Sequence, residues 1–164
     1  MKFLSLITAA VTFSGAILAF DPNILLALVN QQRALVGAPA LTIDPRLDLA
    51  ARRHTLYQAT MQQMTHDEPN TTLGQRISAT GYPWSNIGEN VAAGYGDAVS
   101  VLNAWMNSPA HRRNILDPIF TQTGIAYVPQ GSYWTQEFGR PMMMRKRTSK
   151  FIGGKQSKKS VTAN

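Results

Sequence analysis

Cysteine is absent from all 164 residues of the sequence. The chain therefore cannot form disulfides or thiolate metal sites, and its stability must come from packing and hydrogen bonds. Lysine is absent between Asp21 and Gly139, where seven arginines accompany nine acidic residues, and acidic residues are absent from Arg140 to Asn164, where eight residues are basic. The net charge of +7 thus belongs to the C-terminal segment. The acidic balance of the remainder argues against a nucleic-acid partner.

Charged residues are also missing from the run between Phe3 and Phe20. The basic start at Lys2, the apolar run and the small residues near Ala19 are typical of a secretory signal peptide, which we place at residues 1–19. A transmembrane anchor is the alternative, since the run approaches the ~20 residues that a span needs. Five Ser, Thr and Gly residues dilute the run and favour the signal peptide. We therefore predict a secreted, extracellular protein.

The segment 21–139 is long enough for one domain and shows no internal repeat. An Asp-Pro pair at residues 21–22 and again at 44–45 combines an N-cap with proline at the first helical position, which predicts a helix after each pair. An apolar stripe follows the second pair at a spacing of three and four residues. His54 lies within this stripe, and we interpret it as a packed, hydrogen-bonded imidazole.

Residues 123–128 and 133–138 alternate as strands do, and a Pro-Gln-Gly-Ser turn between them predicts a hairpin. In the second strand, Trp134, Gln136 and Phe138 are expected to share one face. Helical segments combined with a small antiparallel sheet predict an α+β layered domain.

The basic segment 140–164 has no sustained periodicity, and we predict that it is disordered. We expect it either to bind anionic wall polymers or membrane headgroups, or to act only as a solubilising extension. A separate feature is the glycosylation sequon at Asn70, which is usable only in a host that glycosylates secreted proteins.

The stretch Gly88–Leu116 carries an acid, Glu89, and an imidazole, His111. A helix is predicted from Asp97, and Ser108 is placed to begin a second short helix that carries His111. We interpret Ser108 as a helix cap, because no third orienting acid for a serine nucleophile is evident.

Together with His66 in a predicted loop, Glu89 and His111 are residue types that bind zinc. Their separations of 23 and 22 residues match no short metal motif, so the residues alone do not identify a metal site.

Four motifs follow one another along the chain: Gly88-Glu89-Asn90, the run from Trp105 through Ser108-Pro109-Ala110-His111 to Leu116, Gly124-Ile125-Ala126, and Trp134-Thr135-Gln136-Glu137-Phe138-Gly139. In this order they resemble the CAP superfamily, which includes the cysteine-rich secretory proteins, antigen 5 and the pathogenesis-related proteins. The likeness covers residues 25–139 and is strongest to the cysteine-free branch of bacteria and some fungi.

The resemblance implies a three-layer α-β-α sandwich with a small, mainly antiparallel central sheet and a central cleft. Two His and two Glu line this cleft in the best-known members and hold a divalent ion, often zinc. The matching positions here are His66, Glu89 and His111, whereas Ser108 stands where the second Glu is expected. Gln136 is a further candidate for the cleft wall.

The resemblance also implies a function. We expect a secreted binding module for lipid-like, sterol-like, cell-wall or host ligands, acting as a monomer and not as an enzyme. Two alternatives remain. One is a divalent-metal-dependent hydrolase, in which zinc would activate water. The other is a structural wall protein held by its basic tail.

Overall fold

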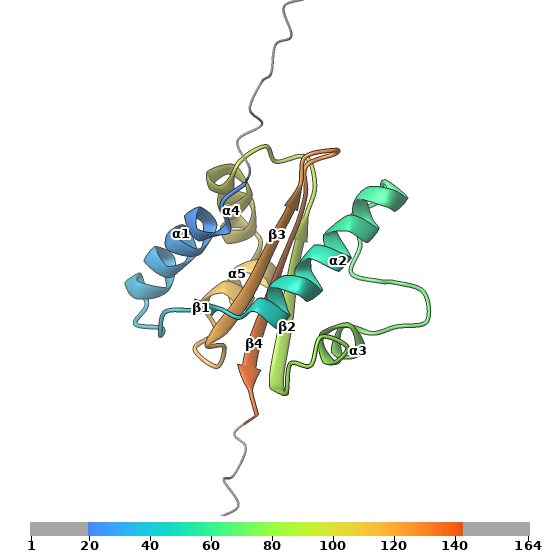
Figure 1. Cartoon of the computed structure of the whole chain (residues 1–164). Helices are drawn as coiled ribbons and strands as arrows, with labels where there is room; N and C mark the ends of the chain where they lie inside the picture. Colours follow the sequence, from blue (N-terminus) through green and yellow to red (C-terminus); the bar gives the residue numbers. More distant parts are fainter. Residues whose placement is uncertain (1–19, 143–164) are drawn as a thin grey trace, which may run out of the picture.

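The computed structural model describes residues 20–142, so the predicted signal peptide and most of the basic tail lie outside the described residues. A four-stranded sheet is flanked by helices on both faces (Figure 1). The elements in chain order are α1 (Pro22–Leu35), β1 (Thr42–Ile43), α2 (Pro45–Met61), α3 (Leu73–Ser78), β2 (Trp84–Ala92), α4 (Ala98–Asn107), α5 (Pro109–Leu116), β3 (Gln122–Val128) and β4 (Tyr133–Pro141).

The helix starts are those that the cap residues predict. The carboxylates of Asp21, Asp44 and Asp97 accept hydrogen bonds from backbone N–H groups of the first turns of α1, α2 and α4. Thr72 and Gln75 form a reciprocal capping box at the start of α3. Local sequence therefore decides where these helices begin.

The strand order in the sheet is β1-β3-β4-β2. The predicted hairpin is confirmed, with β3 and β4 antiparallel, and β1 is parallel to β3. Strand β2, antiparallel to β4, is an element that the sequence analysis does not predict. Its Gly88-Glu89-Asn90 segment interrupts the alternation of apolar and polar residues by which strands are recognised.

The two faces of the sheet are covered by different helices (Figure 1). Helices α1, α4 and α5 pack on one face and build the larger core, which includes Leu25, Val29, Trp105, Trp134 and Phe138. Helix α2 crosses the other face, where a smaller core surrounds Leu47 and Ile77. This is the three-layer α-β-α sandwich with a mainly antiparallel sheet that the resemblance implies.

Among residues 20–142, no helix has the length and apolar character that crossing a bilayer requires.

Candidate functional site

The candidate site lies along β2, which pairs only with β4 in the described sheet. One side-chain amide and one indole from the helices cover its other edge: Asn114 donates to the carbonyl of Glu89 (3.1 Å), and Trp105 Nε1 donates to the carbonyl of Val91 (3.1 Å). These bonds satisfy edge carbonyls and protect the strand from pairing with another chain. They also hold α4 and α5 beside Glu89.

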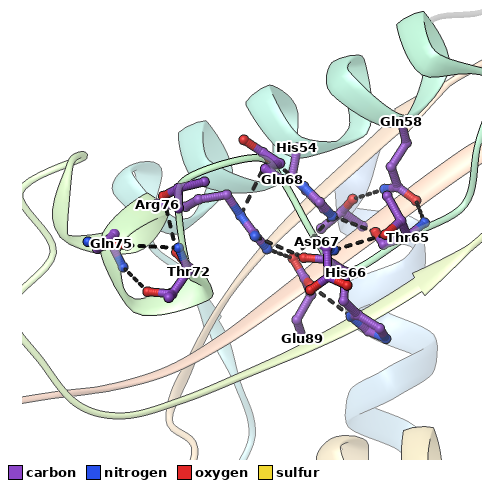
Figure 2. A network of polar contacts seen from close by, with 12 residues as sticks. His54, Gln58, Thr65, His66, Asp67, Glu68, Thr72, Gln75, Arg76 and Glu89 are labelled. Carbon is purple, nitrogen blue, oxygen red and sulfur yellow. Dashed lines mark hydrogen bonds and ion pairs between the residues drawn. The ribbon is translucent and has the colours of Figure 1, made fainter.

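Glu89 is the centre of a polar network and is almost completely buried (Figure 2). One carboxylate oxygen lies 2.8 Å from Nδ1 of His66, and the other lies 2.5 Å from the guanidinium of Arg76. Burial opposes its ionisation, but the hydrogen bond from His66 and the charges of His54 and Arg76 hold the pKa of Glu89 below its usual value. In return, this bond to Glu89 raises the pKa of His66.

His54 is fully buried behind this pair, and both ring nitrogens have partners. Nδ1 lies 2.6 Å from the carboxylate of Glu68, and Nε2 lies 2.8 Å from the carbonyl oxygen of Thr65. The interpretation of His54 as a packed, hydrogen-bonded imidazole is confirmed. Its role is to fasten the loop that carries His66 to α2.

Glu137 is a member of the site that the sequence analysis misses. It lies directly opposite Glu89 in the β2–β4 ladder and is fully buried, and neither carboxyl oxygen has a hydrogen-bond partner among the described residues. Burial, and then the charge of Glu89, raise the pKa of Glu137 well above its usual value. Alternation along β4 places Glu137 on the opposite face from Gln136, but only the register of β4 with β2 sets it opposite Glu89.

Replacing Glu137 with glutamine is expected to stabilise the protein at neutral pH. Because folding raises the pKa of Glu137, the contribution of this residue to the free energy of unfolding is fully present below the pKa of an unfolded glutamate. It is lost as the pH rises toward the folded pKa. Glutamine carries no charge at any pH. The gain in the free energy of unfolding should therefore begin near pH 4.5, the ordinary pKa of glutamate, and grow by about 1.4 kcal/mol per pH unit until the folded pKa is reached. Urea unfolding of both proteins at acid and neutral pH measures it.

Asp67→Asn, at an exposed carboxylate in the neighbouring loop, is the control and should show no comparable gain. A Glu137→Gln protein that is less stable than wild type at neutral pH would contradict the raised pKa of the buried Glu137.

His66 and Glu89 lie in a hollow of about 370 Å³ that Asp67, Thr72 and Arg76 also line. His111 and Ser108 line a second hollow of about 380 Å³, together with Met64, Val91 and Trp105. The linings of the two hollows come from the same chain segments: Met64 lies two residues before His66, and Val91 lies two residues after Glu89. The structure thus brings His66 and Glu89 into contact and places His111 in a neighbouring hollow.

His111 sits in the first turn of α5, where its Nδ1 is buried without a hydrogen-bond partner among the described residues. Burial lowers the pKa of His111, and the charge of His66 lowers it further. Ser108 is the N-cap residue of α5, as predicted, but its side chain makes no capping hydrogen bond. Ser108 lines the same hollow as His111, and its role in a binding cleft stays a prediction.

Gln136 is on the opposite face of the sheet from Glu89 and Glu137. It is fully buried, pairs with Asn90 in the ladder, and its amide lies 3.4 Å from Oγ1 of Thr123. The expectation that Gln136 lines the cleft needs correction, because successive residues of a strand point to opposite faces. It is Glu137 that faces the site.

The family-implied metal ion does not fit these residues as they are arranged. Both oxygens of Glu89 already have partners, and His111 lies in a separate hollow. Between residues 20 and 142, no three His, Cys, Asp or Glu side chains are grouped so that they could hold a metal ion.

Comparison with known proteins decides the family. A model of the cysteine-rich secretory protein family, CAP, matches residues 26–138. The chain belongs to the CAP family. The absence of cysteine agrees with the cysteine-free branch of that family.

This CAP protein is 38% identical over 114 residues to the uncharacterized protein YkwD of Bacillus subtilis (strain 168), a match that covers 68% of this chain and 44% of YkwD. An extracellular protein containing an SCP domain from Bacillus anthracis str. Ames has a TM-score of 0.68 and 31% identity, over 72% of this chain and 39% of its own. An outer surface protein from Borrelia burgdorferi has a TM-score of 0.70 at 23% identity, over 74% of this chain and 92% of its own. The last likeness shows the fold alone.

The chain spans less than half the length of YkwD and of the B. anthracis protein. Both of these structural neighbours are described as extracellular or outer-surface proteins.

Proposed function

We propose that this CAP protein is a secreted binding module that holds a neutral, hydroxyl-bearing lipid of the sterol type. The observation that carries the proposal is a hollow of about 520 Å³ between the N-terminal turns of α1 and α4. Its size is within the range of small-molecule sites. It lies on the face of the sheet away from the network around Glu89.

The walls of this hollow are apolar and open to solvent. Ile24 of α1 is 55% exposed and Val99 of α4 is 54% exposed, and the rings of Phe20 and Tyr127 contribute to the lining. Apolar side chains gathered at the surface of a monomeric protein mark a binding site more often than scattered ones do. Burying this wall against the ring system of a lipid would remove apolar surface from water.

The charge of the side chains that line the hollow favours one class of lipid over another. Asp21 and Asp97 also line the hollow, and no basic side chain of the described residues does. Two carboxylates repel the anionic headgroup of a fatty acid, whereas they can accept a hydrogen bond from a lipid hydroxyl. A sterol-type alcohol therefore fits this hollow better than a fatty acid.

The test measures binding of cholesterol and palmitate, as two separate probes, to the full chain and to Val99→Asp. We expect saturable binding of cholesterol, weaker binding of palmitate, and at least a tenfold loss of cholesterol affinity in Val99→Asp, or about 1.4 kcal/mol. Val99 is exposed, so the substitution should leave the fold intact.

Leu56→Asp is the matched control, because Leu56 is 61% exposed on α2, on the other face of the sheet. It should bind cholesterol as wild type does. Absence of cholesterol binding, or equal losses in the two variants, would contradict the proposal, and tighter binding of palmitate would contradict the argument from charge.

A further inference from the structure

The carboxylate of Glu89 is already paired with a cationic side chain, the guanidinium of Arg76. Its Oε2 lies 2.5 Å from Nη2 of Arg76, and its Oε1 lies 2.8 Å from Nδ1 of His66. Both oxygens with which a carboxylate would ligate a metal are therefore engaged by protein groups, as Figure 2 shows.

Arg76 is held in this position from several directions. Its side chain is only 7% exposed, Nη1 donates to the carbonyl oxygen of His66 (2.9 Å), and Nε lies 3.6 Å from the carboxylate of Glu68. Arg76 belongs to α3, a helix whose start is fixed by the capping box of Thr72 and Gln75. The guanidinium is thus part of the framework of the site.

We propose that Arg76 is the permanent cation of this cleft and that it excludes the divalent metal ion that other members of the family hold. A zinc ion on Glu89 would meet a second positive charge on the same carboxylate, and arginine cannot lose its proton to relieve the repulsion. Displacing Arg76 instead would leave a buried guanidinium without its ion-pair partner, which is costly.

The imidazoles support the same conclusion. His66 turns Nδ1 toward Glu89, and His111 faces the neighbouring hollow lined by Met64 and Trp105. The fourth family position holds Ser108, whose hydroxyl is a poor substitute for a carboxylate ligand. This chain therefore has a serine in place of one acidic ligand, and the other acidic ligand, Glu89, is paired with Arg76.

The experiment compares zinc binding by wild type, Arg76→Gln and Arg76→Lys, each as the full chain, by isothermal titration with a zinc salt. Wild type should take up no zinc at the cleft, and Arg76→Lys, whose ammonium keeps the charge but can lose its proton, should bind zinc more weakly than Arg76→Gln. Arg76→Gln, which removes the charge but keeps a hydrogen-bond donor, should gain at least about tenfold in zinc affinity. Adding Glu89→Gln to this variant should abolish the gain.

A wild-type protein that binds one zinc ion, with binding lost in His66→Ala, would overturn the proposal. So would an Arg76→Gln protein that folds as wild type does and gains no zinc affinity, because the charge of Arg76 would then not be the excluding element.

A measurement on wild type alone keeps the test decisive if Arg76→Gln does not fold. The imidazole proton resonances of His66 and His111 are followed by NMR as zinc is added and then removed by a chelator. Unmoved resonances support exclusion of zinc, whereas shifts of both that the chelator reverses would overturn it. The outcome is independent of the proposed lipid site, which lies between α1 and α4.

Discussion

Replacing Arg33 with methionine is expected to destabilise the protein by about 4 kcal/mol or more, although Arg33 is far from the polar network. The side chain of Arg33 is completely buried, and its guanidinium donates to four backbone carbonyls: Pro39 (2.7 Å), Ile115 (2.7 Å), Asp117 (3.0 Å) and Phe120 (2.9 Å). Methionine fills a similar volume but donates to none of them. Each carbonyl left buried without a partner costs about 1–3 kcal/mol.

The bonds of Arg33 explain why this arginine tolerates burial. Two of the carbonyls are at the C-terminal end of α5, where the last residues of a helix have no partner within the helix. Burial lowers the pKa of Arg33, and the carboxylate of Asp117 partly offsets this effect. Arginine, with five donors on a rigid plane, can satisfy carbonyls from several segments at once. It joins α1 to the end of α5 and so holds the helix that carries His111.

Urea unfolding of the full chain measures this effect, with Arg52→Met as the control. Arg52 is 68% exposed and forms one surface ion pair with Asp48, so its loss should cost less than about 1 kcal/mol. Similar midpoints for Arg33→Met and Arg52→Met would contradict the role that we assign to Arg33. Arg33→Lys should recover only part of the loss, because one ammonium group cannot span four carbonyls.

Gly124→Ala is expected to be the second severe substitution, with a cost of about 3 kcal/mol or more. A Cβ atom added at Gly124 would overlap the carbonyl carbon of Leu47 and the backbone nitrogen of Asp48. Both atoms belong to the backbone of the first turn of α2, so no side-chain rotation can make room. The helix would have to move away from β3, breaking the bond from the Ile125 amide to the Asp48 carboxylate (3.2 Å).

Gly96→Ala provides the comparison for this effect. Nothing lies within 4 Å of a Cβ atom built at Gly96, so this substitution should change stability by about 0.5 kcal/mol at most. Thermal unfolding of the two variants should separate them by many degrees. Equal unfolding temperatures would show that α2 can move from β3 at little cost and would contradict the close packing.

The sequence predicts those parts of the fold that depend on neighbouring residues. The Asp-Pro pairs mark the starts of α1 and α2, and the alternation of residues 123–138 predicts the β3–β4 hairpin. The local predictions succeed because caps, turns and strand alternation act over a few residues. The resemblance adds the sandwich, and its assignment of His66, Glu89 and Ser108 to one site stays a prediction.

The partners within the site could not be predicted in the same way. Arg76 meets Glu89 across 13 residues, and Glu137 meets Glu89 only through the register of β2 with β4. Strand β2 has no clear pattern of its own, so neither its pairing nor its register can be derived locally. The expectation for Gln136 failed for the same reason, since the face of β4 that meets Glu89 is decided by that pairing.

The amino-acid sequence by itself determined the helix starts, the hairpin and the absence of disulfides. Only the tertiary structure decided that Arg76 takes the carboxylate of Glu89, that Glu137 is buried beside it, and that His111 faces a different hollow. The physical reason is the separation along the chain between the groups that interact. Hydrogen bonds of caps and turns form between near neighbours in the chain, whereas the charges of this site interact across strands and helices whose placement depends on the packing of the whole domain.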